Sequence, residues 1–286
     1  MAIEITVAIP GTARVGESPC WDAGTGTLSW VDIMSGTVYR SDLSSPAQTV
    51  VELPIMVGAA VPKASGGFVT ATARGFADID PGGRVVRQLD VLPDGVRMND
   101  AKCDPAGRFW AGGCALDFAT GQGSLHVLQP DWTTEEVFSG LTQPNGLGWS
   151  PDGATFYLID TQARQLTAYD VVPGQIVPAA PRVLKRFPVP LGYPDGLTVD
   201  ADGGLWVAMW GGGRILHLSP SGRVIDELPM PVAQPSSCVF GGPELDVLYV
   251  TSATEGMAVG PDDPSGSVFA VTGLGVRGLP SQRFGG

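Results

Sequence analysis

The sequence predicts an all-β protein, a six-bladed β-propeller with four antiparallel strands in each blade. A turn that contains glycine, followed by a short strand of aromatic and β-branched residues, recurs six times along the chain. Successive copies are roughly 40 to 50 residues apart, which is the period of a four-stranded blade. No long stretch has convincing helical periodicity. Repeated strands without helices indicate a ring of blades.

Each predicted blade has two hairpins. The first hairpins contain the segments 23–33, 64–75, 104–113, 150–161, 200–210 and 241–253. The second hairpins contain the segments 36–43, 75–83, 123–131, 165–174, 213–222 and 266–273, in which apolar and polar residues alternate. The β-rich segment 5–9 is expected to complete the last blade and close the ring, which removes the exposed edges. No linker is evident, so we expect one domain over residues 1–286.

Composition excludes several classes of protein. The net charge of -12 argues against binding to nucleic acid or to an anionic membrane, and it suits a protein that attracts a cation. The sequence lacks a long apolar run and a basic amino-terminal region, so neither a membrane span nor a signal peptide is expected. The cysteines are far apart in the sequence and are expected to be buried, reduced core residues of a cytoplasmic protein: Cys20, Cys103, Cys114 and Cys238.

One polar position recurs in the repeat. Asn99, Asn145 and Asp195 each lie eight residues before a turn glycine, and Glu17 lies eight residues before its own turn at Thr25. Ser236 matches more loosely in the last blade and is expected to be structural. Residues at this position enter the innermost strand of a blade, so they should converge at one mouth of the central channel.

Two carboxylates and two amides form a set of oxygen donors that suits a hard divalent cation. We expect Ca²⁺ first, with Mg²⁺ or Mn²⁺ as alternatives; Zn²⁺ is also possible, although it prefers His or Cys. The competing interpretation is structural, because Asp and Asn at strand entries often bind loop backbone. Arg97 could clamp a polar substrate at the same mouth or pair with Asp100, and Asp117 could reach the same place.

Other catalytic chemistries have little support. His126 and His217 occupy equivalent strands away from the strand entries, where they are expected to fill space. No GxSxG motif occurs, and no histidine is placed to activate a serine. The glycine-rich segment 210–215 does not open a helix, so it is not expected to bind phosphate. Acid–base chemistry is therefore expected from carboxylates or metal-bound water.

The motifs at 16–21 (GESPCW), 97–113 (RMNDAKCDPAGRFWAGG), 143–153 (QPNGLGWSPDG) and 193–208 (YPDGLTVDADGGLWVA) resemble those of the gluconolactonase / regucalcin / luciferin-regenerating-enzyme family. The resemblance covers most of the chain. It implies that Glu17, Asn145 and Asp195 hold one divalent metal ion and that Asp195 is also the general base. It implies that Arg97 and Asn99 contact the substrate.

The sequence departs from the family at two places expected on the pocket rim. Asp117 stands where the family has a Glu that contacts substrate, in a shorter loop (114–124), and Met98 stands where an aromatic residue is common. These departures leave the identity of the substrate open.

The expected function is metal-dependent hydrolysis of a sugar lactone to the aldonic acid, which would make the protein a hydrolase of carboxylic esters and a monomer or weak homo-oligomer. The alternatives are a calcium-dependent phosphotriesterase and a non-enzymatic metal-binding or interaction propeller. A synthase resembling strictosidine synthase ranks last, because it lacks this metal set.

Overall fold

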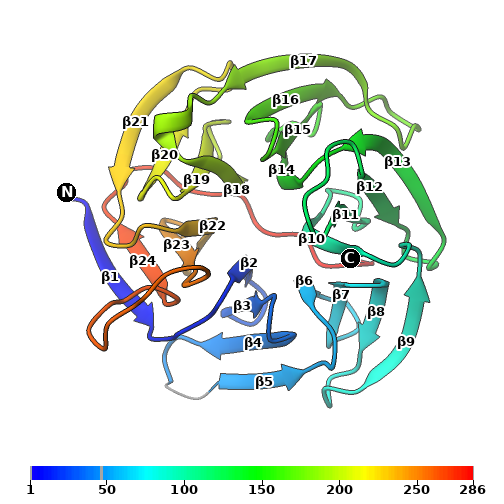
Figure 1. Ribbon diagram of the computed structural model, residues 1–286, viewed down its shortest axis with the longest axis horizontal. Helices are drawn as coiled ribbons and strands as arrows, with labels where there is room; N and C mark the ends of the chain where they lie inside the picture. Colours follow the sequence, from blue (N-terminus) through cyan, green and yellow to red (C-terminus); the bar gives the residue numbers. More distant parts are fainter. Residues whose placement is uncertain (1, 46–47, 286) are drawn as a thin grey trace.

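The computed structural model describes residues 2–45 and 48–285, and it confirms the predicted propeller. Six sheets of four antiparallel strands form a ring around a central axis (Figure 1). Blade 1 contains β2 (Gly16–Asp22), β3 (Thr27–Asp32), β4 (Thr37–Asp42) and β5 (Gln48–Glu52), and blade 2 contains β6 (Val57–Pro62), β7 (Phe68–Thr72), β8 (Gly75–Ile79) and β9 (Val85–Asp90). Blade 3 contains β10 (Val96–Cys103), β11 (Phe109–Ala115), β12 (Gly123–Leu128) and β13 (Thr134–Leu141), and blade 4 contains β14 (Pro144–Trp149), β15 (Thr155–Asp160), β16 (Gln165–Asp170) and β17 (Ala179–Arg186). Blade 5 contains β18 (Tyr193–Val199), β19 (Leu205–Trp210), β20 (Arg214–Leu218) and β21 (Val224–Pro229), and blade 6 contains β22 (Pro235–Gly241), β23 (Val247–Ser252), β24 (Val268–Thr272) and β1 (Glu4–Ile9).

The ring closes through the amino-terminal strand, as predicted. β1 pairs antiparallel with β24, with Ile5 opposite Val271, and it forms the outer strand of blade 6. The first and last parts of the chain therefore share one sheet. This arrangement joins the two ends of the ring by backbone hydrogen bonds.

Helix is almost absent. Within residues 2–45 and 48–285, the structure has one short 3-10 helix, η1 (Val189–Leu191). In the same ranges, no helix is long and apolar enough to cross a membrane.

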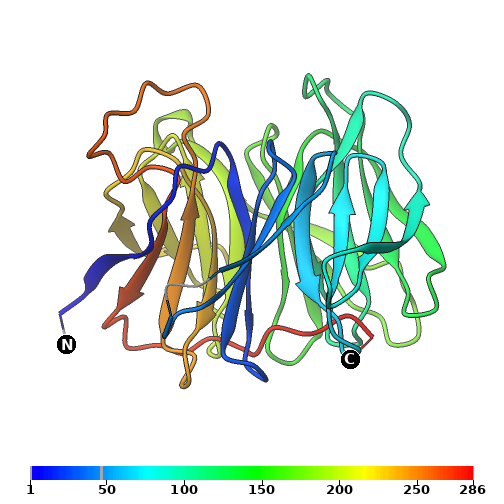
Figure 2. The same ribbon diagram turned by 90° about the horizontal axis from the view of Figure 1, so that it is seen from below.

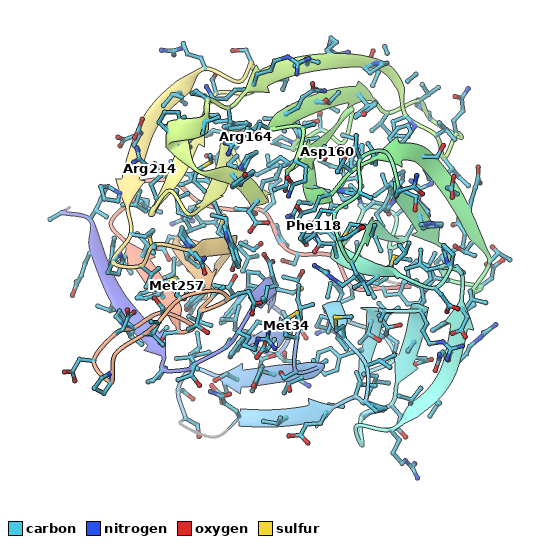
Figure 3. All side chains as sticks on the ribbon, in the orientation of Figure 1. Met34, Phe118, Asp160, Arg164, Arg214 and Met257 are labelled. Carbon is cyan, nitrogen blue, oxygen red and sulfur yellow. The ribbon has the colours of Figure 1, made fainter. Side chains whose placement is uncertain are left out.

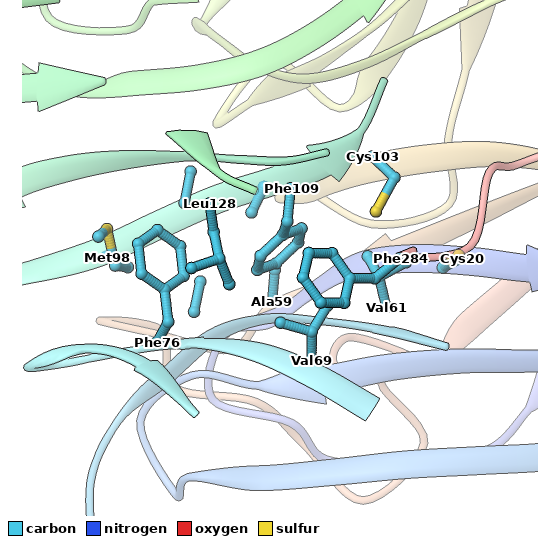
Figure 4. Close-up of a cluster of buried hydrophobic side chains, with 13 residues drawn as sticks. Cys20, Ala59, Val61, Val69, Phe76, Met98, Cys103, Phe109, Leu128 and Phe284 are labelled. Atoms are coloured by element: carbon cyan, nitrogen blue, oxygen red, sulfur yellow. The ribbon is translucent and has the colours of Figure 1, made fainter. Parts of the chain in front are cut away.

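Apolar side chains between neighbouring blades hold the ring together. The inner strands β2, β6, β10, β14, β18 and β22 contact one another in turn around the axis. Between blades 2 and 3, Phe76 meets Phe109 edge to face with ring centroids 6.0 Å apart (Figure 4). All four cysteines are free and buried, as predicted.

Met98 belongs to this core and not to the pocket rim. Its side chain is fully buried in the cluster that contains Phe76 and Phe109 (Figure 4). Because successive side chains of a strand point to opposite faces, Met98 points away from the face of its neighbours Arg97 and Asn99. The prediction that Met98 shapes the pocket rim is therefore wrong.

The inner strands are irregular where the candidate residues lie. In blades 3, 4 and 5, two residues stand opposite one residue of the neighbouring strand, and the first of the two is Asn99, Asn145 or Asp195. In blade 1 the irregularity falls one residue later, at Ser18, so Glu17 precedes it. A β-bulge bends a strand and re-aims its side chains, and bulges are common beside functional sites.

The carboxy-terminal segment 273–284 runs across the other end of the channel. Figure 2 shows this segment in red along the face opposite the long 254–267 loop. Gly278 forms a bridge with Asp200, and Phe284 forms one with Lys63 on the far side of the ring. The buried Phe284 ring meets Trp132 edge to face. We call this segment the carboxy-terminal strap.

Candidate functional site

A cavity of about 430 Å³ opens at the mouth where the chain enters the inner strands. Its walls include every predicted metal ligand and two of the three predicted substrate contacts: Glu17, Arg97, Asn99, Asn145 and Asp195. These residues come from four different blades, and their side chains are buried. The repeat position therefore brings together residues that are far apart in the sequence.

Blade 2 contributes no polar side chain at this position. Gly58 occupies it, five residues before the turn that starts at Lys63. A Cβ atom on Gly58 would lie 2.1 Å from the backbone oxygen of Asn99. Only glycine allows the two inner strands to approach so closely.

Asn145 links two parts of the cavity through its amide. Its Nδ2 donates to Asp195 Oδ1, and it donates to Thr161 Oγ1 at 3.1 Å. Its Oδ1 is buried and has no hydrogen-bond partner among the described residues. A buried acceptor without a partner is costly, so this oxygen is suited to an additional positively charged partner.

The two carboxylates of the cavity are electrostatically unfavourable by themselves. Burial raises the pKa of Glu17 well above its usual range, and the charges of Asp195 and Asp100 raise it further. Burial also raises the pKa of Asp195, and Asp100 adds to this effect. A cation between these groups would oppose both effects.

The donor set fits a hard cation. Glu17, Asp195 and the Oδ1 atom of Asn145 offer oxygen ligands only, which suit Ca²⁺, Mg²⁺ or Mn²⁺. Among the residues that the structure describes, no group of three or more His, Cys, Asp or Glu side chains is placed to hold a metal. The third protein ligand would therefore be the amide of Asn145.

Arg97 and Asn99 form a rigid pair beside these oxygens. Arg97 Nη1 donates to Asn99 Oδ1 at 2.8 Å and to the backbone oxygen of Met98 at 3.0 Å. Asn99 Nδ2 donates to the backbone oxygen of Pro144 at 3.1 Å. The pair has a defined orientation and leaves guanidinium N–H groups to face a polar ligand.

Asp100 does not pair with Arg97, the alternative considered from the sequence. Its Oδ1 accepts hydrogen bonds from Ser18 Oγ at 3.0 Å and from the backbone N–H of Ala101 at 2.8 Å. Within residues 2–45 and 48–285, the structure contains no ion pair between Arg97 and Asp100. Asp100 is a buried carboxyl group near the cavity that the repeat pattern did not reveal.

Binding of loop backbone at the strand entries, the structural role considered for the site residues, is performed in blades 1 and 4 by other carboxylates. Asp32 accepts hydrogen bonds from the backbone N–H groups of Arg14 and Val15, at 3.1 and 3.0 Å. Asp160 holds the entry of blade 4 in the same way, at 2.9 Å from Thr142 N and 3.0 Å from Gln143 N. These aspartates fix the strand entries of blades 1 and 4, which leaves Glu17 and Asn145 available for a ligand.

Asp117 does not line the cavity. Its side chain is exposed, and its Oδ1 accepts the backbone N–H of Ala119 at 3.0 Å within a turn. The neighbouring side chains of Leu116 and Phe118 line the cavity instead. The loop therefore turns an apolar surface, and not this carboxylate, toward the site.

The remaining polar candidates lie outside the cavity. Ser236 Oγ donates to the backbone oxygen of Gly16, which joins blades 6 and 1 and agrees with a structural role. His126 lies in β12 with its Nε2 at 2.8 Å from Ser124 Oγ. His217 lies in β20 and stacks on Trp206 with ring centroids 4.1 Å apart.

Several residues of the cavity were not predicted. Val15, Gln143 and Tyr193 line it, each two residues before a site residue. Residues two apart in a strand share a face, and this spacing had already drawn attention to Arg97. The same rule applied to every blade would have found these three residues. The ends of the second strands, such as Thr161 and Trp210, also line the cavity, and the repeat pattern gave no signal for them.

Comparison with known proteins identifies the family. The model of the SMP-30/Gluconolactonase/LRE-like region matches residues 15–254. Regucalcin from Xenopus laevis is 35% identical over 299 residues, covering 100% of this chain and 99% of that protein. A luciferin-regenerating enzyme has a similar structure, with a TM-score of 0.90 and 32% identity over 99% of each chain. A calcium-binding regucalcin from Agrobacterium tumefaciens also has a TM-score of 0.90, with 28% identity over 97% of this chain and 96% of that one. The chain belongs to the SMP-30/gluconolactonase/LRE-like family.

Proposed function

We propose that this protein hydrolyses a sugar lactone to the corresponding aldonic acid with the help of one bound divalent cation, Ca²⁺ in the first instance. The observation that carries the proposal is the convergence of Glu17, Asp195 and the unpartnered Asn145 Oδ1 in one buried cavity beside Arg97. The family name includes gluconolactonases, and one relative is described as a calcium-binding protein, which supports both parts of the proposal.

The cation would be held by Glu17, Asn145 and Asp195. When bound, it would supply Lewis-acid polarisation of the lactone carbonyl. The residues of the chain supply orientation and proton transfer. Arg97 and Asn99, which already hold each other in place, bind ring hydroxyl groups. Such positioning lowers the entropic part of the barrier.

Asp195 is the proposed general base. It accepts a proton from a water molecule as the water oxygen attacks the carbonyl carbon. The bond between that carbon and the ring oxygen then breaks, and the proton passes to the departing ring oxygen. The products are one carboxylate, one hydroxyl group and a proton released to solvent. The hydrogen bond from Asn145 Nδ2 orients the Asp195 carboxylate for this transfer.

The test is a panel of aldonolactones and organophosphates offered to the chelated protein, with Ca²⁺, Mg²⁺, Mn²⁺ and Zn²⁺ restored one at a time. Turnover of a lactone that depends on a restored cation is expected. Turnover of organophosphates alone would favour the phosphotriesterase. No turnover of either class with any cation would refute the proposal that the protein is an enzyme and would favour a metal-binding or interaction propeller.

The variant Asp195→Asn tests the general base. The Asn side chain retains an oxygen that can accept the hydrogen bond from Asn145, but it cannot take up a proton. A loss of turnover of at least about a hundredfold is expected, the lower range for removal of a general base. Unchanged circular dichroism and thermal unfolding would show that the fold is retained, and an active variant would refute the assignment.

A further inference from the structure

We infer that the preferred lactone carries an apolar substituent, such as the methyl group of a 6-deoxy sugar, that contacts an apolar rim formed by Met34, Leu116, Phe118 and Tyr193. The inference rests on the proposed lactone hydrolysis and specifies its substrate class. The four rim residues line the same cavity as Asp195. Figure 3 shows Met34 and Phe118 close to the ring axis, from different blades.

The exposed apolar residues of the protein are distributed unevenly. Ten of the fourteen large hydrophobic residues that are exposed in the described ranges are Val or Ile. The other four are Met34, Leu116, Phe118 and Tyr193, and all four line this one cavity. Single exposed apolar residues are normal, but a group gathered at a pocket indicates a binding surface.

Polar groups of the same rim are already engaged with one another. Gln162 Nε2 donates to Gln143 Oε1 at 2.8 Å. Glu255 accepts two hydrogen bonds from the guanidinium group of Arg14, at 2.8 and 3.0 Å. Thr161 Oγ1 donates to the backbone oxygen of Pro194 at 2.8 Å. These contacts use part of the hydrogen-bonding capacity of the rim, so a hydroxyl group placed beside Leu116 and Phe118 would gain fewer partners there than it has in water.

The rim is held in place before any ligand binds. The Arg164 guanidinium lies over the Tyr193 ring, 3.8 Å from its centroid. The N–H of Phe118 donates to the backbone oxygen of Ala115 at 3.0 Å, in a left-handed conformation with φ of 56°. The loop that carries Leu116 and Phe118 is tied to the connection between blades 3 and 4 by a hydrogen bond from Gly121 N to Thr142 Oγ1 at 3.3 Å. A preorganised apolar wall loses little entropy on binding.

The cavity therefore has two chemically distinct parts. Arg97 and Asn99 present polar groups beside the carboxylates, and the rim presents methyl, thioether and aromatic surface. A substrate with hydroxyl groups on its lactone ring and a methyl or short alkyl group beyond the ring matches both parts. A lactone that ends in a hydroxymethyl group would place a polar group against Leu116 and Phe118.

The test compares matched lactones that differ only at the terminal carbon. L-Fucono-1,4-lactone and L-galactono-1,4-lactone form one pair, and L-rhamnono-1,4-lactone and L-mannono-1,4-lactone form the other. We expect kcat/KM to be about tenfold or more higher for the deoxy member of at least one pair, the range for one apolar group in a pocket. Equal rates for both members of both pairs, or faster hydrolysis of the hydroxymethyl members, would overturn the inference.

Two rim variants test the location of this preference. Phe118→Asn introduces a polar side chain that tolerates the left-handed backbone at this position. Leu116→Gln introduces a polar side chain two residues earlier. Each should reduce the deoxy preference, while Val86→Thr, at an exposed site on β9, should retain it. A preference that survives in both rim variants would refute the rim as its source.

The outcomes for the two proposals are distinguishable. Turnover without a deoxy preference refutes the apolar substituent and leaves lactone hydrolysis intact. No turnover of any lactone with any restored cation refutes both.

Discussion

Cation binding should stabilise this protein, because the cavity buries two carboxylates and an amide oxygen without a partner. A ligand that binds only the folded state at a hundredfold excess over its Kd adds about 2.7 kcal/mol of unfolding free energy. At about 2.1 cal/mol/K per residue, a chain of 286 residues has an unfolding entropy of about 0.6 kcal/mol/K. The expected rise in Tm is therefore about 4 to 5 °C.

The assay is thermal unfolding of the chelated protein, followed by circular dichroism or calorimetry, with increasing Ca²⁺. The double variant Glu17→Gln/Asp195→Asn removes both charges and keeps oxygen atoms at both positions. Its Tm should not respond to Ca²⁺. Without cation, its Tm should exceed that of the chelated wild type, because burial of the two carboxylates and their mutual repulsion are relieved.

Asp117→Asn is the matched control, since Asp117 is an exposed carboxylate on the cavity side of the ring that does not line the cavity. It should keep the wild-type response. Two results would refute the reasoning: no rise in Tm with Ca²⁺, Mg²⁺, Mn²⁺ or Zn²⁺, or an equal rise in the double variant.

Three further predictions concern the strap and the loop beside the cavity. Phe284→Ala should lower the unfolding free energy by about 3 to 5 kcal/mol in urea, because the ring is buried at the end of the strap, whereas Val86→Ala should change it by less than about 0.5 kcal/mol. Burial would raise the pKa of Asp22, but hydrogen bonds from Arg283 and Thr25 outweigh this effect and hold the pKa below its usual value. Arg283→Met should therefore lower the unfolding free energy by about 1 kcal/mol at pH 7, after allowance for screening. The difference in unfolding free energy from wild type should shrink as the pH falls below about 4, because Asp22 becomes protonated. A difference that grows in acid would contradict this ion pair. Asp117→Asn should leave kcat/KM within about twofold, and a loss above tenfold would restore Asp117 as a substrate contact.

Much of the fold and of the candidate site followed from periodicity. Alternating strands separated by turns predicted the blades, and equal spacing predicted that Glu17, Asn145 and Asp195 would share one mouth. This inference succeeds because equivalent positions of a repeat are related by rotation about the axis. Spacing in the sequence therefore becomes proximity in space.

Contacts outside the repeat could not be predicted in this way. The direction of the Asp117 carboxylate depends on one turn and on the left-handed residue Phe118 that follows it. The burial of Met98 depends on which face of β10 meets blade 2. These features arise from irregular local geometry, which no other blade repeats.

The sequence by itself determined the ring, the closure through the first strand and the convergence of the oxygen ligands, because each follows from a pattern repeated around one axis. Only the tertiary structure decided that the carboxy-terminal strap crosses the far end of the channel and that the cavity rim is apolar. The strap and the loop that carries Leu116 and Phe118 each occur once in the chain. The strap is placed by packing against blades far from it in the sequence, as where Phe284 meets Trp132, and the loop of Phe118 is placed by its bond to Thr142 in the connection between blades 3 and 4.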